Sequence, residues 1–168
     1  MSDAVSGVEE ILAQWARERP DLDVSPMAVI GRLTRAASIV EAELADTFAA
    51  NGLDAASFDV LATLLRSGAP HELSPKALSA SAMVTSSAIA QRVNKLEDAG
   101  LVVRRRSETD GRGTVVALAE AGRRLVEQAL PDHLATERRL LADLSPADQT
   151  VLAELLSRIG SPRGVAYG

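Results

Sequence analysis

Cysteine is absent from the 168 residues of this sequence. Its absence excludes disulfide switching, thiolate catalysis and metal sites built on thiolates. Histidine is scarce as well, because only His71 and His133 occur. We expect His71 to be solvated in its loop, and His133 to lie at a surface or an interface where it could tune a response to pH. Any switch in this protein must therefore depend on a ligand or on pH.

A second absence is a long apolar run. The sequence contains nothing close to the roughly 20 apolar residues that a membrane-spanning helix requires. Its first residues, Met-Ser-Asp-Ala, lack the basic and apolar character of a signal peptide. A chain of 17.7 kDa corresponds to one domain, or to a domain with arms, and is large enough for a real core. We therefore expect a cytoplasmic protein with no membrane partner.

An excess of positive charge is also missing, since the net charge is −5 and the isoelectric point is about 5.1. The charges are unevenly placed, however. Between residues 85 and 113, six basic residues outnumber four acidic ones, namely Arg92, Lys95, Arg104, Arg105, Arg106 and Arg112 against Glu97, Asp98, Glu108 and Asp110. A basic segment on an acidic body permits specific DNA binding, limits non-specific adhesion and makes affinity strongly salt dependent.

The most informative segment spans residues 74–118 and has the order of a helix-turn-helix followed by a hairpin. Ser74 is a predicted N-cap, with Pro75 in the first turn of a short helix. A second helix is predicted from Ser86 to about Asp98, with Thr85 as its N-cap. This order indicates a winged helix that binds DNA.

The two faces of the second helix differ in character. Its core face is apolar and consists of Ala88, Ile89, Val93 and Leu96. Its opposite face is polar and consists of Ser86, Ser87, Gln91, Asn94 and Lys95. Hydroxyl groups and cations bind phosphates, and Gln and Asn amides can read adenine in the major groove. We therefore predict that this second helix is the recognition helix. Three further residues of the helix-turn-helix are also predicted to contact DNA, namely Ser74, Lys76 and Thr85.

The hairpin follows Gly100, which is expected to end the recognition helix. Residues 101–106 and 114–118 are rich in β-branched side chains and flank a segment with two glycines, so they predict two paired strands. Three arginines of this wing are predicted to reach the DNA backbone or the minor groove, namely Arg105, Arg106 and Arg112. Plain surface charges on a solvated hairpin are the alternative.

Helices with apolar stripes are predicted on both sides of the winged helix. The first carries its stripe from Val5 to Trp15, has Ser6 and Glu9 spaced as a capping box, and ends before Pro20. Further helices are predicted over 26–50, 55–66, 120–141 and 145–160, the second of them capped by Asp54.

The predicted fold is mainly α with a small β hairpin. It has N-terminal helices for dimerisation and one wall of a ligand pocket over 1–52, a winged helix-turn-helix over 53–118, C-terminal dimerisation helices over 119–160 and a flexible tail over 161–168. The C-terminal helices carry more apolar surface than a small winged helix can cover, at Leu125, Leu130, Leu134, Leu140, Leu141, Leu144, Leu152, Leu155 and Leu156. A symmetric homodimer would cover it and would read a palindromic operator with half-site centres about 10 bp apart. A monomer with a larger core is the alternative.

The motifs around the wing resemble those of the MarR family of winged-helix regulators, and the resemblance covers nearly the whole chain. They are Leu96-Glu-Asp-Ala-Gly-Leu-Val before the first wing strand, Asp110-Gly-Arg in the wing and Leu118-Ala-Glu-Ala-Gly-Arg after it. Ala119 departs from the family, which usually has a capping Thr there, and the wing tip holds fewer arginines than in many members. The resemblance implies a transcriptional regulator, which we expect to be a repressor.

The sequence further resembles the urate-responsive subset of that family at Trp15, Asp59, Arg92 and Arg104. This resemblance implies that an anionic purine binds between the dimerisation helices and the winged helix, shifts the recognition helices and releases the DNA. An anion that pulls either arginine would move a DNA-reading element. Trp15 offers a flat face and an indole donor to a planar ligand. No cofactor is expected beyond such a small-molecule effector.

The residues alone leave alternatives open. Trp15 could be a core residue, and Asp59 could form a structural ion pair with Arg104. The effector could be a phenolic carboxylate or another small anion that contacts the same arginines. The winged helix could bind a protein instead of DNA. An enzyme is disfavoured because no glycine-rich phosphate loop and no metal-spaced cluster of ligands occurs in the sequence.

Overall fold

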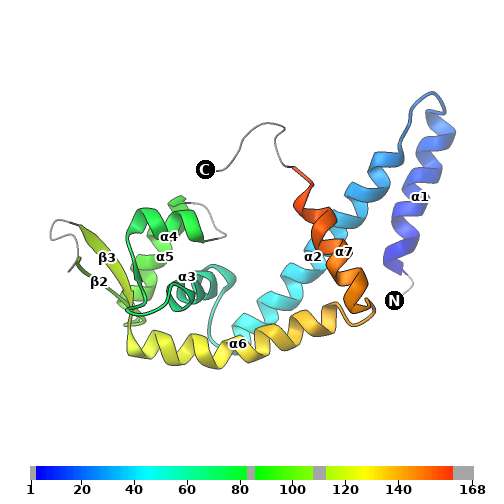
Figure 1. Ribbon diagram of the computed structural model, residues 1–168. Helices are drawn as coiled ribbons and strands as arrows, with labels where there is room; N and C mark the ends of the chain where they lie inside the picture. Colours follow the sequence, from blue (N-terminus) through cyan, green and yellow to red (C-terminus); the bar gives the residue numbers. More distant parts are fainter. Residues whose placement is uncertain (1–2, 83–85, 108–112, 161–168) are drawn as a thin grey trace.

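The computed structural model describes residues 3–82, 86–107 and 113–160. Along the chain it contains α1 (Asp3–Glu18), α2 (Ser25–Ala50), α3 (Ala55–Arg66), β1 (Glu72–Leu73), α4 (Pro75–Ser81), α5 (Ser86–Asp98), β2 (Val102–Arg106), β3 (Thr114–Leu118), α6 (Glu120–Leu140) and α7 (Pro146–Ser157). Figure 1 shows an elongated molecule with α3, α4, α5 and the β2–β3 hairpin at one end, α1 at the other, and α6 running between the two ends. The predicted fold class is confirmed.

Local capping signals set most of the helix boundaries. The Asp54 carboxylate accepts a hydrogen bond from the Ser57 amide at 2.8 Å, and the Ser74 hydroxyl accepts one from the Ala77 amide at 3.1 Å. Each of these bonds satisfies an amide that the first helical turn leaves without a partner. Gly100 follows α5 with a φ of 69°, a left-handed conformation that suits glycine. The predicted caps at Asp54 and Ser74 and the predicted end of the recognition helix are therefore confirmed.

Two sequence predictions need correction. Ser6 lies inside α1, which begins at Asp3, so Ser6 and Glu9 do not form a capping box at a helix start. The hairpin also has a third strand beside it, because β1 pairs with β3 in antiparallel register, with Glu72 opposite Ala117. A strand of two residues has no periodicity to detect in the sequence. The pairing of β1 with β3 was therefore not predicted from the sequence.

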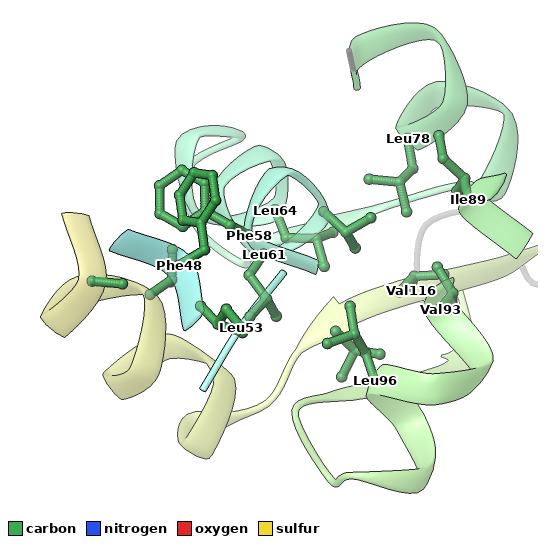
Figure 2. Packing of buried hydrophobic residues seen from close by; sticks show 14 residues of the cluster. Phe48, Leu53, Phe58, Leu61, Leu64, Leu78, Ile89, Val93, Leu96 and Val116 are labelled. Carbon is green, nitrogen blue, oxygen red and sulfur yellow. The ribbon is translucent and has the colours of Figure 1, made fainter. Parts of the chain in front are cut away.

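The hydrophobic core is centred on α3. Val60, Leu61 and Leu64 of this helix are fully buried. Side chains from α4, α5, the sheet and α6 surround them, including Leu78, Ile89, Val93, Leu96, Val102, Val116 and Val126 (Figure 2). Three of the four residues predicted on the core face of α5 are thus confirmed, while the Ala88 side chain lies outside the described part. The packing fixes α5 so that its other face points away from the core.

The first turn of α6 packs very closely against the start of β2. A Cβ atom added to Gly122 would lie 2.0 Å from the carbonyl oxygen of Leu101. The same oxygen accepts a hydrogen bond from the Ala119 amide at 3.1 Å, and the Leu101 amide donates to Leu96 at 2.8 Å. The end of α5, the start of β2 and the start of α6 therefore meet at one backbone position, and only glycine fits there.

The second half of α6 is joined to α2 by polar contacts. The hydroxyl groups of Thr47 and Thr136 share a hydrogen bond of 2.8 Å, and Asn51 donates to Asp132 at 3.1 Å. Arg139 donates to Glu43 at 2.7 Å near the end of the helix. Consequently α6 is attached to the winged helix at its start and to α2 at its end.

The outer helices leave much apolar surface uncovered in the single chain. Within the described residues α7 buries no side chain, and the 26-residue α2 buries only Phe48. Of the predicted excess of leucines, Leu125 and Leu130 pack against the core, whereas Leu134, Leu141, Leu152, Leu155 and Leu156 are exposed. In the described part, no single helix is long and apolar enough to cross a membrane, although α2 and α3 meet the length and composition criteria when taken together across their 76° bend.

Candidate nucleic-acid interface

Helix α5 presents a polar face to solvent. Its buried face holds Ile89, Val93 and Leu96, each less than 5% exposed. The predicted DNA contacts Gln91, Asn94 and Lys95 are all exposed on the rest of the helix. Ser74 and Lys76, at the start of α4, are exposed as well. Thr85 and the side chains of Ser86 and Ser87 lie outside the described part, so the structure places only the later turns of the predicted reading face.

The wing arginines alternate between the two sides of the sheet. Arg104 lies opposite Val116 in the β2–β3 register, on the side of the buried Val102 and of α5. Arg105 lies opposite Val115 on the other side, where its Nε donates to Glu72 on β1 at 3.0 Å. Arg106 is exposed at the end of β2, and Arg112 lies outside the described residues. Arg105, which was predicted to contact DNA, therefore forms an ion pair with Glu72 on the other edge of the sheet.

Arg104 ties the wing to the recognition helix. Its guanidinium donates to the Glu97 carboxylate and to the Asn94 amide oxygen, and its backbone amide donates to Glu97 at 2.9 Å. The backbone hydrogen bond, followed by the guanidinium hydrogen bond and charge, holds the pKa of Glu97 below its usual range despite some desolvation. Any group that draws Arg104 away would loosen the contact between α5 and β2.

Arg92 and Lys95 tie α5 to the start of α3. Arg92 Nη1 lies 2.6 Å from Oδ2 of Asp54, and Lys95 Nζ lies 3.2 Å from the same oxygen. Partial burial by itself would raise the pKa of Asp54, but hydrogen bonds from Ser57 and Lys95 and the charge of Arg92 outweigh it, so this pKa is lowered. Asp54 is thus charged at neutral pH and holds two cations of the recognition helix.

Sequence comparison agrees with this geometry. The sequence pattern of the MarR family matches residues 51–113, which include α3, α4, α5 and β2. The chain is also 38% identical over 152 residues to the HTH-type transcriptional regulator PecS of Dickeya dadantii, covering 90% of this chain and 92% of PecS. This chain belongs to the MarR family. It is a DNA-binding transcriptional regulator of that family and not an enzyme.

Solved structures share the fold, among them that of the MarR-family regulator Sco3205. Sco3205 from Streptomyces coelicolor, determined in complex with DNA, is 24% identical, has a TM-score of 0.74 and covers 81% of this chain and 86% of its own. CouR from Rhodococcus jostii RHA1, determined bound to p-coumaroyl-CoA, is 25% identical, has a TM-score of 0.69 and covers 82% of this chain and 95% of its own. The likeness extends well beyond the winged helix.

The four predicted effector residues of this MarR-family chain lie in two separate regions. Arg92 and Arg104 are on neighbouring elements, but each already contacts a carboxylate, Asp54 and Glu97 respectively. Asp59 is half-buried on α3 and has contacts of its own. Trp15 is on α1, which Figure 1 places at the opposite end of the molecule from α5 and β2. Because Trp15 is 41% exposed, it is not a core residue of the single chain.

A cavity beside one of these arginines is small. It borders Arg104 and has a volume of about 120 Å³, enclosed mainly by apolar side chains of α4, α5 and β3 such as Leu78, Ile89 and Val116. Typical ligand pockets are about 300 to 1,000 Å³. An effector pocket that uses all four residues therefore needs either the α1 of a second copy or a different placement of the helices.

The sequence did not predict the carboxylate partners of the basic residues, and the predicted positions of both histidines need correction. Asp54 was predicted only as a cap, and nothing in the sequence links it to Arg92, 38 positions away. Of the two positions predicted for His133, the surface is wrong for the single chain, because its side chain is 17% exposed and its ring lies 4.8 Å from that of Phe58 and 5.5 Å from that of Phe48. The interface stays a prediction. His71, predicted to be solvated, is instead partly buried, with Nδ1 3.0 Å from the Leu65 carbonyl oxygen.

Proposed function

We propose that this MarR-family regulator is a homodimeric repressor, which binds a palindromic operator in the cytoplasm and is released by an anionic aromatic ligand, urate or a related purine. The main support for the proposal is that two arginines each form contacts that hold a DNA-reading element in place. Arg92 links α5 to Asp54, and Arg104 links β2 to Asn94 and Glu97 of α5. An anion that draws either guanidinium away from its present partner would weaken one of these contacts.

The dimer is supported by the uncovered apolar surface. With the exception of Val103, the large hydrophobic side chains that are exposed in the described residues lie on α1, α2, α6 and α7 or in the loops beside them. A patch of this kind, remote from the polar face of α5, is typical of an interface between copies. Two copies related by a twofold axis would present two recognition helices, which favours a palindrome with half-sites about 10 bp apart.

Release by the ligand requires a difference in affinity between two arrangements. The ligand must bind the arrangement that cannot read DNA more tightly than the one that can. A coupling of about 1 to 3 kcal/mol changes operator affinity by about 5- to 150-fold. Asp54 and Glu97 compete with an anion for Arg92 and Arg104, so a ligand would bind more tightly to an arrangement in which these pairs are open.

A phenolic carboxylate or another aromatic acid is the second candidate effector. The arginines would serve either anion, and the structure of CouR with p-coumaroyl-CoA is that of a similar fold with an aromatic acyl group bound. Urate differs in needing a flat partner and polar groups around a purine, which Trp15 and Asp59 would supply. The two candidates therefore differ in their dependence on Trp15.

A mobility-shift titration tests the proposal. The chain is bound to DNA from its own upstream intergenic region, and urate, related purines and salicylate are added in parallel. Release by urate alone supports the purine pocket, whereas release only by phenolic acids supports the second candidate. If no complex forms even at low salt, the proposal that this winged helix binds an operator in that region is wrong.

We expect Arg92→Ala to preserve the dimer and to blunt the response to urate. Losing a hydrogen bond to a charged group costs about 1.5 to 3 kcal/mol, so the urate concentration that releases half of the operator should rise by about tenfold or more. The release curve is measured at the same fraction of bound DNA for each variant, because operator affinity can also fall. Arg124→Ala, which removes an exposed arginine paired with Glu120 on α6, is the control. Normal release by the Arg92 variant would exclude Arg92 from the pocket.

A further inference from the structure

Asp54 occupies a junction between the core and the reading face of α5. Its Oδ1 accepts from the Ser57 amide at 2.8 Å and caps α3, while its Oδ2 contacts Arg92 at 2.6 Å and Lys95 at 3.2 Å. The capping bond fixes the carboxylate to α3, whose side chains form the centre of the core. Each carboxylate oxygen of Asp54 therefore has a partner, because Oδ1 caps α3 and Oδ2 binds the cations of α5.

Arg92 and Lys95 differ in how far their side chains are exposed to solvent. Arg92 and Lys95 stand one turn apart on α5, and their side chains are 26% and 66% exposed. Arg92 is held between the helices, where its contact with Asp54 limits rotation of α5 about its axis. Lys95 extends over the polar face, where a DNA phosphate could replace the carboxylate. One acidic group thus contacts both a side chain that links α5 to α3 and a cation on the polar face of α5.

We infer that Asp54 is a positioning residue that sets the sequence selectivity of DNA binding, through its ion pairs with Arg92 and Lys95. The inference rests on the proposed use of α5 as the reading helix. Non-specific binding is almost entirely electrostatic, so neutralising Lys95 weakens it. Base readout depends instead on where side chains sit in the groove, so the contact with Arg92 favours the operator. Both effects increase the ratio of operator affinity to non-specific affinity.

The variant Asp54→Asn separates charge from capping. Asparagine is as good an N-cap as aspartate and has nearly the same shape, so α3 keeps its first turn. Affinities for the operator and for an unrelated duplex of equal length are measured over a range of salt concentrations. We expect non-specific affinity to rise severalfold, with a salt dependence steeper by about one released ion. Operator affinity should not rise in proportion, so the selectivity ratio should fall by about fivefold or more, equivalent to 1 kcal/mol.

Two further variants make the result decisive. Asp21→Asn removes the same charge from an exposed pair with Arg19 between α1 and α2, and should leave the selectivity ratio unchanged. Adding Lys95→Gln to the Asp54 variant should abolish the gain in non-specific affinity. If the Asn variant does not fold, Asp54→Ser, which also retains a capping oxygen, takes its place.

The outcomes separate this inference from the proposed function. An unchanged selectivity ratio in a folded Asp54 variant would overturn the inference and leave DNA binding intact. Equal losses of affinity for both duplexes, with a lower melting temperature, would show a merely structural role and would also overturn it. If the unsubstituted chain forms no complex with either duplex, the proposed function fails first and the inference fails with it.

Discussion

Gly122→Ala should lower the free energy of unfolding by about 3 kcal/mol, at the upper end of what overpacking usually costs. The added methyl group would lie 2.0 Å from the Leu101 carbonyl oxygen, and a backbone atom cannot rotate out of the way. Relief of the clash requires α6 to move away from β2, which breaks the hydrogen bond from Ala119 to the same oxygen. For a chain of this size the melting temperature should fall by about 6 to 12 °C.

Denaturant unfolding at fixed protein concentration measures this effect, and Gly31→Ala provides the control. Gly31 is also inside a helix, but a Cβ atom there would meet only the Val8 side chain at 3.4 Å. Replacing a helical glycine without a clash gains up to about 1 kcal/mol from helix propensity. The two variants should therefore change stability in opposite directions. Similar stability in both would mean that α6 does not approach β2 this closely in solution.

Leu155→Glu should separate the proposed dimer and reduce operator affinity by more than about 100-fold. Leu155 is 49% exposed in the single chain, on a helix that buries no side chain against the rest of the described residues. In a dimer interface, an uncompensated buried charge costs about 3 to 5 kcal/mol. A monomer would contact one half-site, and the second recognition helix would no longer contribute.

Sedimentation and light scattering report the oligomeric state of this variant, and operator titrations report its affinity. Ala147→Glu adds the same charge to the first turn of the same helix, where an acidic side chain is favourable, and should leave both properties unchanged. If Leu155→Glu has the mass of the unsubstituted protein and its operator affinity, the apolar face of α7 is not part of the interface.

The success of sequence reasoning depended on whether the relevant signal was local. Asp54, Ser74 and Gly100 act on residues within one turn, and each was predicted to start or end a helix at its observed position. The wing strands were predicted to within one residue from their β-branched composition, since Leu101 lies just before β2. Local chemistry was thus sufficient for most of the fold.

Interactions between distant residues were not predictable in this way. The pair of Glu72 with Arg105 requires β1, which is too short to be recognised, and the pair of Asp54 with Arg92 requires the packing of α3 on α5. The sequence supplied the basic residues of the candidate site, whereas the structure supplied their acidic partners. The residues predicted from the resemblance to urate-responsive proteins stay a prediction, because Trp15 and the two arginines are apart in the single chain.

Because α6 is attached at both ends, a tilt of this helix relative to α2 would displace the winged helix. Its 21 residues span about 32 Å at 1.5 Å per residue. One end is locked to the winged helix at Gly122, and the other is hydrogen-bonded to α2 through Thr136 and Asp132. The part of α6 between Thr136 and Gly122 spans about 21 Å, so tilting the helix as a rigid rod by about 5° at Thr136 displaces its wing end by about 2 Å. In a symmetric pair the two displacements add, so this tilt would change the distance between the recognition helices by about 4 Å and weaken their fit to successive major grooves.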